Sequence, residues 1–304
     1  MRIDAHQHFW RYDAAEYEWI DESMTAIRRD FLPEDLQKEM RTAGFDASVA
    51  VQARQSLDET RWLLGLADEH PFIAGVVGWV DLQSDVVEAQ IEAVRHPKLV
   101  GVRHIVQAEA DGFLARPAFR RGIAALERHG LAYDILVYAR QLREAIPFAA
   151  AFPEQRFVLD HLGKPDIRAG AFDSWRRDLD RFAALPNVWA KLSGLVTEAD
   201  WRRWTRAELH RYVEAAFDAF DADRLMIGSD WPVCTVAGTY TDVMEVVTTA
   251  LERRSAAERD AVLGGTAAKF WNLHVPSADP HPPRIRWSRR SPVQFRKWKP
   301  PQSN

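Results

Sequence analysis

Ile3-Asp4-Ala5-His6-Gln7-His8-Phe9-Trp10 contains the first of eight short apolar runs in this sequence. Side chains of a β-strand alternate between two faces, so Asp4, His6 and His8 would share one side of a strand over residues 2–8. Two imidazoles at a strand end can converge on a metal ion or shuttle a proton near neutral pH. The alternative is a pair of histidines that fill space and form hydrogen bonds, and the H-x-H pattern alone does not decide between them.

The other seven runs recur along the chain, and segments with helical spacing of apolar residues separate them. The runs span residues 47–52, 73–80, 99–106, 132–138, 156–161, 188–193 and 224–230. The helical segments span residues 33–42, 57–69, 86–95, 117–129, 140–150, 173–184, 206–220 and 241–253. Strand alternating with helix implies right-handed crossovers onto a parallel sheet, and eight such units predict a single (β/α)8 TIM barrel of the α/β class over residues 1–274. An open doubly wound sheet would be expected to carry a G-x-G-x-x-G loop after an early strand, and the sequence has none.

Composition limits the class of protein. A chain of 304 residues has the length of one α/β barrel or of two ordinary domains. Its 47% hydrophobic and 28% charged residues are typical of a soluble globular protein, and no run approaches the roughly 18 apolar residues of a membrane helix. The net charge of −4 argues against a nucleic-acid partner. A single cysteine and the lack of an apolar signal core predict a cytoplasmic protein, with homo-oligomerisation left open.

Residues 275–304 differ in composition from the rest of the chain. They contain seven Pro, seven Lys or Arg and one acidic residue, with no helical or strand period. Residues 1–274 carry 33 basic and 43 acidic residues, a net charge of −10. We therefore expect an irregular, basic, Pro-rich extension packed on the acidic surface of the barrel. The alternative is an arm that grips a partner subunit or an anionic partner.

Three polar motifs lie where the predicted strands end, which is where barrels of this kind place their chemistry. They are IDAHQHFW at residues 3–10, LDHLGKP at 159–165 and GSDWP at 228–232. In this order the motifs resemble the amidohydrolase superfamily, and more narrowly its amidohydrolase-2 branch of sugar lactonases of the L-fuconolactonase and L-rhamnonolactonase type. The resemblance covers about residues 1–273, and three motifs at correctly ordered strand ends are far more specific than one.

The resemblance implies roles for four residues. His6 and His8 match the first-strand histidine pair, His161 the sixth-strand histidine, and Asp230 the eighth-strand aspartate that takes a proton from the hydrolytic water. The fifth run has no histidine and the fourth has no lysine or glutamate to bridge two metals, so a two-metal centre is not expected. Either no metal is essential, or these four residues hold one divalent ion, for which their nitrogen and oxygen ligands favour zinc.

Lactone hydrolysis needs a base for water, a group that stabilises the oxyanion and a proton for the departing ring oxygen. Asp230 is the candidate base, although an aspartate there could instead cap the loop. His161 could hold the water or donate to the carbonyl, or it could be a core histidine bonded to the backbone. Cys234 follows Asp230 closely, but it has no histidine near it in sequence and is expected to be a small buried thiol.

Arg103 and His104 are neighbours in one strand and must face opposite sides. The β-branched residues that share a face with His104 suit the surface under the helices, so Arg103 is predicted to point inward, where its cation could polarise the carbonyl or anchor a hydroxyl. A bulge at the strand end would exchange the two, and both are kept as catalytic candidates. Lys191 in the seventh strand is a second candidate cation, or else a member of a buried ion pair.

Side chains for substrate binding are expected at the same ends of the strands. Three tryptophans lie at or just past a strand end, and indole rings stack on the C–H faces of sugars; they are Trp10, Trp79 and Trp231. The polar candidates for the sugar hydroxyls are Gln52, Arg54 and Tyr138. Most other tryptophans fall in helical segments, where packing is the expected use.

The sequence thus predicts hydrolysis of a sugar-acid lactone, a small-molecule substrate, by water that Asp230 activates. Three rivals are testable. A metal-dependent decarboxylase of the same superfamily would keep the fifth-strand histidine, and a dicarboxylate-lactone hydrolase would need several cations near the pocket. A non-catalytic sugar-binding barrel would keep the tryptophans and would not need Asp230.

Overall fold

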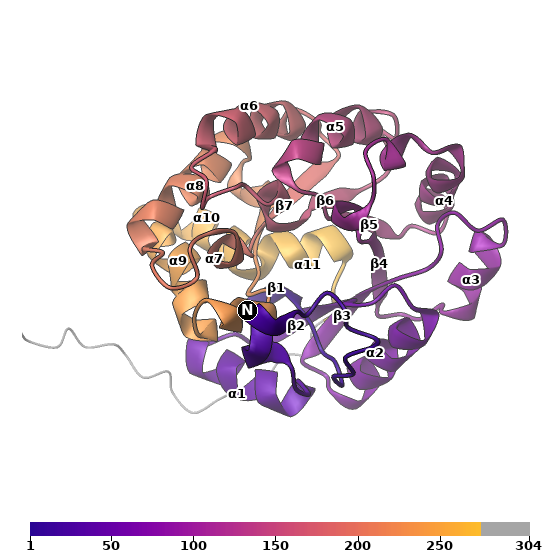
Figure 1. Cartoon of the computed structure of the whole chain (residues 1–304), viewed down its shortest axis with the longest axis horizontal. Coiled ribbons are helices and arrows are strands. Elements are labelled where there is room, and N and C mark those ends of the chain that lie inside the picture. The colour runs from indigo at the N-terminus through magenta and orange to yellow at the C-terminus, as the bar shows by residue number, and fades with distance from the viewer. Residues whose placement is uncertain (275–304) are drawn as a thin grey trace, which may run out of the picture.

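The apolar runs form eight parallel strands at the centre of the structure, a computed structural model that describes residues 1–274 (Figure 1). The strands are β1 (Ile3–Gln7), β2 (Ala47–Val51), β3 (Ile73–Gly78), β4 (Leu99–His104), β5 (Ala132–Ile135), β6 (Phe157–Leu159), β7 (Val188–Leu192) and β8 (Leu225–Ile227). Each lies within a predicted run, and helices surround them, so the predicted TIM barrel is confirmed. The predicted packing of residues 275–304 lies outside the described residues.

Neighbouring strands pair in sequence order from β1 to β8, always in parallel. The two edges of the sheet meet at an isolated bridge between Gln7, the last residue of β1, and Trp231, which follows β8. The His8 N–H donates to the Trp231 carbonyl at 2.6 Å, and the Asp230 N–H donates to the His6 carbonyl at 2.8 Å. Residues 6–8 and 230–231 therefore connect the two edges of the sheet at the end where the polar motifs lie.

Helices cover the outside of the strands. They are α1 (Pro33–Ala43), α2 (Leu57–Glu69), α3 (Val87–Ala93), α4 (Pro117–Arg128), α5 (Leu142–Ala150), α6 (Phe172–Ala183), α7 (Leu195–Glu198), α8 (Arg206–Ala219), α9 (Tyr240–Ala250), α10 (Ala256–Asp260) and α11 (Thr266–Trp271). Local signals explain their ends: Ser56 accepts the N–H groups of Asp58 and Glu59 at the start of α2, and Gly44 ends α1 at a φ of 75°. The predicted helical segments match α1 to α6, α8 and α9. The short helices α7, α10 and α11 were not predicted.

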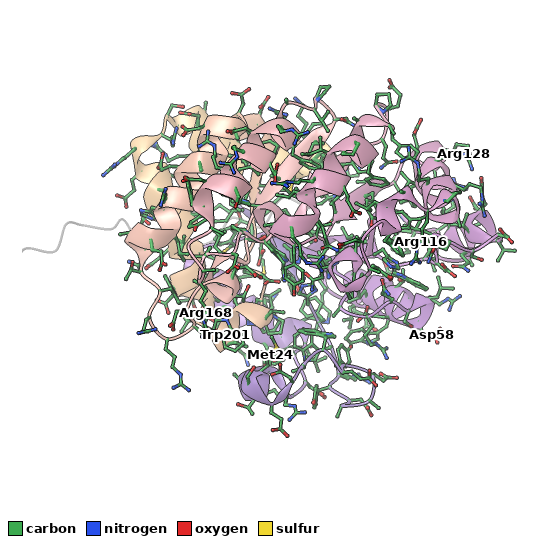
Figure 2. The ribbon with its side chains drawn as sticks, turned by 45° about the horizontal axis from the view of Figure 1, so that its top comes forward. Met24, Asp58, Arg116, Arg128, Arg168 and Trp201 are labelled. Atoms are coloured by element: carbon green, nitrogen blue, oxygen red, sulfur yellow. The ribbon has the colours of Figure 1, made fainter. Side chains whose placement is uncertain are left out.

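The end of the barrel opposite the polar motifs is closed by α11. Phe270 and Trp271 of this helix pack in one buried cluster with Ile3, Val49 and Met226 of the strands. Met24 and Trp201, which lie in segments that follow strands, are toward the bottom of Figure 2, whereas Arg128 at the end of α4 lies near the top. Among the described helices, none combines the length and the apolar character that crossing a membrane requires.

Glu59 of α2 is a buried carboxylate that holds the loop after β2. It accepts hydrogen bonds from the backbone N–H groups of Ala53 and Arg54 at 3.1 and 2.8 Å. Burial raises the pKa of Glu59 to about 7, against the opposing effects of these hydrogen bonds and of the Arg54 charge. The folded protein therefore holds a proton on Glu59 at pH values where the unfolded chain has released it.

We expect the Glu59→Gln variant to lose part of the pH dependence of stability. This contribution to the free energy of unfolding is fully present below the ordinary pKa of 4.5, and it is lost as the pH rises through about 7. Between these two pH values, the contribution of Glu59 to the free energy of unfolding falls by about 1 kcal/mol per pH unit. Urea unfolding from pH 4.5 to 8 measures it, with Glu69→Gln on the exposed face of α2 as the control. If the difference in the free energy of unfolding between wild type and Glu59→Gln stays constant with pH, then the pKa of Glu59 is not raised in the folded protein.

Candidate active site

A cavity of about 250 Å³ opens at the carboxyl ends of the strands. Four predicted residues from different strand ends contribute to its wall: His8 after β1, Arg103 in β4, His161 after β6 and Asp230 after β8. The rest of the lining is Trp19, Ala53, Gln55, Ile105, Gln107, Ala108, Leu136, Lys164 and Val233. The pocket combines apolar walls with a few convergent polar groups, as small-molecule sites do.

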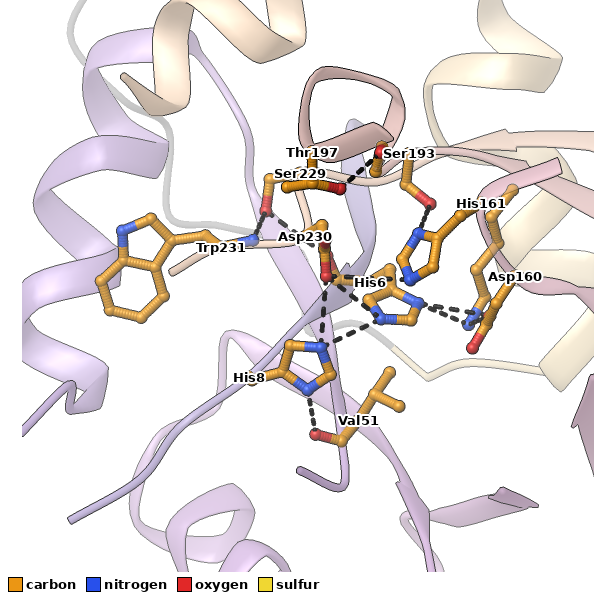
Figure 3. A network of polar contacts seen from close by, with 12 residues as sticks. His6, His8, Val51, Asp160, His161, Ser193, Thr197, Ser229, Asp230 and Trp231 are labelled. Atoms are coloured by element: carbon orange, nitrogen blue, oxygen red, sulfur yellow. Dashed lines mark hydrogen bonds and ion pairs between the residues drawn. The ribbon is translucent and has the colours of Figure 1, made fainter. Parts of the chain in front are cut away.

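Three imidazoles surround one carboxylate oxygen at the bottom of this cavity (Figure 3). Asp230 Oδ1 lies 3.3 Å from His8 Nε2, 3.7 Å from His6 Nε2 and 3.8 Å from His161 Nε2. His6 and His8 approach each other at 3.1 Å through their Nε2 atoms. Residues separated by more than 220 positions in the sequence thus form one compact cluster.

Burial keeps the three imidazoles neutral. It lowers the pKa of His161 to about 4, and it lowers the pKa values of His6 and His8 below their ordinary value. Burial alone would raise the pKa of Asp230, but the interactions with His161, His8 and His6 outweigh it and hold that pKa below its ordinary value. The cluster at neutral pH is one ionised carboxylate among neutral imidazoles.

His8 gives a direct test of whether a metal ion fits. Its Nδ1 lies 2.7 Å from the Val51 carbonyl, which can only accept, so Nδ1 carries the proton and Nε2 carries a lone pair. That lone pair faces Asp230 Oδ1 at 3.3 Å, an approach of two acceptors that a cation between them would relieve. Tetrahedral zinc with ligands at about 2.0–2.1 Å holds ligand atoms roughly 3.3 Å apart. His6, His161 and Asp230 offer ligand atoms that all lie within 4.8 Å of one another, and His8 Nε2 lies 3.3 Å from Asp230 Oδ1, so this donor set fits one such ion.

Left-handed backbone places the site residues after β6 and β8. His161, Leu162, Lys164 and Asp230 have φ values of 54°, 53°, 48° and 57°, which non-glycine residues rarely adopt. Such conformations persist only where the surroundings hold them, and they concentrate at functional sites. Both segments belong to motifs that the sequence analysis selected.

Asp4 supports the Asp230 segment from the side of β1 that faces helix α9. The prediction that Asp4 shares a face with His6 and His8 is therefore wrong, because the register of β1 against β2 shifts between Asp4 and Gln7. Its carboxylate accepts the Ser229 N–H at 2.9 Å, the Ser229 hydroxyl at 2.6 Å and the Tyr240 hydroxyl at 3.1 Å. The Ser229 hydroxyl oxygen in turn accepts the Trp231 N–H at 3.0 Å. A side chain of the first strand therefore positions the residues on both sides of Asp230.

Arg103 points into the barrel, as the strand alternation predicted. Its NH1 lies 3.0 Å from Asp160 Oδ2 and 3.3 Å from His6 Nε2. The prediction of His104 as an alternative catalytic residue is corrected, because its ring stacks on Phe113 at 4.8 Å outside the strands and its Nε2 meets Glu109 at 2.9 Å. The register of β4 shifts against β3 between Leu99 and Gly101, at the start of the strand, but it is unbroken against β5 through Arg103 and His104, so the two residues are not exchanged at the strand end.

Lys191 lies beneath the cluster and does not line the pocket. Its ammonium is fully buried, 2.9 Å from Asp160 Oδ1 and 3.2 Å from His6 Nδ1, and it donates to Asp134. Burial raises the pKa of Asp134 to about 7, whereas Lys191, His6 and Arg103 outweigh burial and hold the pKa of Asp160 well below its ordinary value. The buried ion pair, one of the two predicted uses of Lys191, is the one in the structure.

The three tryptophans expected to stack on substrate do not line the cavity. Trp10 is fully buried and its indole N–H donates to the Arg29 carbonyl at 2.9 Å. Trp231 is 3% exposed and packs against Phe31 with ring centroids 5.2 Å apart. Trp79 is half-buried, with its backbone bonded to the Thr60 hydroxyl. A position after a strand end did not determine where these side chains point.

The predicted hydroxyl-binding residues also lie outside the lining. Gln52 is buried and its amide donates to the Arg103 carbonyl at 3.1 Å, so it supports Arg103. Arg54 pairs with Glu16 and lies over the Tyr17 ring. Tyr138 is 38% exposed, and its ring lies 5.3 Å from Lys164 Nζ. Burial raises the pKa of the Cys234 thiol well above its ordinary value, which agrees with the predicted inert thiol.

Four polar or aromatic residues of the lining were not predicted: Trp19, Gln55, Gln107 and Lys164. Trp19 comes from the segment between β1 and α1, where no periodic pattern guides a prediction. Gln107 has a buried side-chain oxygen with no hydrogen-bond partner among the described residues, which makes it a ready acceptor for a ligand hydroxyl. Lys164 stands in the LDHLGKP motif, so its position was available as a signal.

A parallel (β/α)8 barrel with histidines and an ionised aspartate at its strand ends defines the class of protein: a barrel hydrolase whose site has the ligand set of a single divalent ion. The family model described as Amidohydrolase (Amidohydro_2) matches residues 3–273. The chain belongs to this amidohydrolase family.

Similar proteins agree with this assignment. The chain is 47% identical over 289 residues to an L-fucono-1,5-lactonase of Burkholderia multivorans, covering 91% of this chain and 98% of that one. It is 39% identical over 290 residues to an L-fucono-1,5-lactonase of Burkholderia ambifaria, covering 92% and 99%. A crystal structure of an amidohydrolase from Burkholderia multivorans with bound zinc superimposes with a TM-score of 0.87 at 47% identity, covering 90% of this chain and all of that one.

Proposed function

We propose that this protein hydrolyses a sugar-acid lactone of the L-fucono-1,5-lactone type to the open-chain sugar acid. The observation that carries the proposal is the ionised Asp230 at the bottom of a pocket, surrounded by three neutral imidazoles and close to the Arg103 cation. Identities of 47% and 39% to two L-fucono-1,5-lactonases over nearly the whole chain support this substrate class.

Asp230 would act as the general base. Its carboxylate takes a proton from a water molecule as the water oxygen attacks the lactone carbonyl. Neutral His161 Nε2 and His8 Nε2 lie within 3.8 Å of Asp230 Oδ1 and would hold that water beside it. The proton on Asp230 then passes to the ring oxygen as the C–O bond breaks, which leaves a hydroxyl and a new carboxylic acid.

Arg103 would stabilise the negative charge that develops on the carbonyl oxygen. Asp160 and Gln52 hold its guanidinium at the pocket wall, so little reorganisation accompanies the reaction. Gln107, whose side-chain oxygen has no hydrogen-bond partner within residues 1–274, and Gln55 would bind hydroxyls of the substrate. Trp19, which is 39% exposed, offers the aromatic surface that Trp10 and Trp231 do not.

A divalent ion, zinc by its ligand types, is the cofactor that the donor set supports. His6, His8, His161 and Asp230 would hold it, and the zinc-bound structure of the similar amidohydrolase supports the same ion. A bound ion would supply Lewis-acid character at the bottom of the pocket.

The rival functions find less support. The fifth strand carries Asp134 and no histidine at its inward position, which argues against the predicted decarboxylase. The permanent cations of the described lining are Arg103 and Lys164, and each is paired with a carboxylate, which argues against a dicarboxylate substrate. A silent sugar-binding barrel would not need the ionised Asp230 that the imidazoles hold.

A pH-indicator screen of aldonolactones tests the proposal, because each turnover releases a proton at neutral pH. L-Fucono-1,5-lactone and related five- and six-membered lactones are compared with aromatic acids and dicarboxylate lactones, before and after dialysis against a chelator. We expect turnover of aldonolactones alone, and a return of any chelator-sensitive activity when zinc is restored. A preparation that hydrolyses no lactone in either metal state overturns the proposal.

A further inference from the structure

Both permanent cations of the described pocket lining are paired with carboxylates behind the wall. Arg103 NH1 lies 3.0 Å from Asp160 Oδ2, and Lys164 Nζ lies 3.2 Å from Glu198 Oε1. Lys164 lines the pocket, Glu198 lies behind it, and their side chains are 15% and 16% exposed. Glu198 is the last residue of α7, a four-residue helix that follows β7.

The charge of the ligand changes during the proposed reaction. An aldonolactone is neutral, whereas the sugar acid formed from it carries a carboxylate at neutral pH. An unpaired cation in the wall would attract that product more than the substrate, and tight product binding slows turnover when release limits the rate. Pairing each cation with a carboxylate removes most of this preference.

Resting on the proposed lactonase function, we propose that Glu198 is a specificity-determining residue. It neutralises Lys164 at the pocket wall, so that the pocket accepts a neutral lactone and releases the anionic sugar acid. The same pairing discriminates against lactones that carry a free carboxylate.

The backbone of Lys164 is held independently of Glu198, and its ammonium has a second contact besides Glu198. Lys164 has a left-handed φ of 48°, and its N–H donates to the His161 carbonyl at 2.9 Å. Its ammonium also lies 5.3 Å from the centre of the Tyr138 ring, a second favourable contact. Removal of the Glu198 charge therefore leaves the cation at the wall, now without its counterion.

A purely structural role for the pair predicts a different result. If the pair only joined α7 to the loop after β6, then loss of either partner would have the same effect on ligand binding. The electrostatic role predicts opposite effects for the two partners.

The test compares Glu198→Gln with Lys164→Met in the full-length protein at equal metal content. The ligands are the sugar acid and its neutral lactone, and the readouts are the product inhibition constant and the dissociation constant from calorimetry. We expect Glu198→Gln to lower the inhibition constant of the sugar acid about tenfold and Lys164→Met to raise it. The double variant returns it close to the wild-type value.

Glu214→Gln is the matched control, because Glu214 pairs with Arg254 on the outside of the barrel and the variant makes the same charge change. An inhibition constant that stays unchanged in Glu198→Gln overturns the inference, and so does a shift of the same sign in both single variants. If Glu198→Gln does not fold, a Lys164→Met variant that binds the acid as tightly as wild type overturns it as well. Turnover with unaltered product binding refutes only this inference, whereas absence of all lactone turnover refutes the proposed function.

Discussion

The Asp230→Asn variant is expected to hydrolyse lactones about 10³-fold more slowly than the wild type, the middle of the range for loss of a general base. An amide has nearly the shape of the carboxylate but takes no proton from water near neutral pH. Asp230 Oδ1 lies within 3.8 Å of three imidazole nitrogens, so the substitution changes the group at the centre of the cluster.

The measurement is kcat and KM for the best aldonolactone, with metal content determined for each preparation. Asp85→Asn is the control, because Asp85 is 93% exposed in a surface pair with Arg121 and bears no relation to the pocket. Circular dichroism and thermal unfolding establish that the Asp230→Asn variant is folded. A folded variant within tenfold of the wild type would remove Asp230 from the role of base.

Lys191→Met is expected to have the largest effect on stability, a loss of about 3 kcal/mol in the free energy of unfolding. Lys191 is fully buried between Asp134 and Asp160, and Met removes the charge while keeping most of the apolar stem. The carboxylates that remain must stay ionised in a buried site or take up protons. Activity should fall too, because Lys191 lies 3.2 Å from His6 Nδ1.

Urea unfolding measures this loss, with Lys38→Met on the exposed side of α1 as the control. The double variant Lys191→Met/Asp134→Asn removes one cation and one carboxylate together, so it should recover most of the lost stability. If the single variant is as stable as the wild type, or the double variant is less stable than the single one, then the Asp134–Lys191 contact does not stabilise the fold.

The strands and most helices could be predicted from sequence because burial repeats with the period of each element. Runs such as Ile73–Gly78 are apolar on both faces since helices cover one face and the interior the other. The short helix α7 escaped prediction because four residues carry no period, and yet it provides Glu198.

The cluster of His6, His8, His161 and Asp230 was predictable because all four lie at strand ends, and closure of the barrel brings strand ends together. The positions of the tryptophan side chains could not be predicted in this way, because the direction of a side chain beyond a strand end depends on the backbone conformation of the loop. Trp10 turns inward to bond the Arg29 carbonyl, while Trp19 reaches the pocket from a segment without regular pattern. Asp4 and Asp160 were missed because their partners are distant in sequence, as for Asp4 and Ser229, 225 positions apart.

The backbone hydrogen bonds between residues 6–8 and 230–231 affect how the protein folds during synthesis. A ribosome completes His6 and His8 more than two hundred residues before it completes Asp230, and the backbone bonds from His8 to Trp231 and from Asp230 to His6 cannot form earlier. Until the last strand emerges from the ribosome, the nascent chain therefore has an unpaired edge of the sheet, and His6 and His8 lack Asp230. The active site is therefore completed only when the barrel closes, after the last strand has been synthesised.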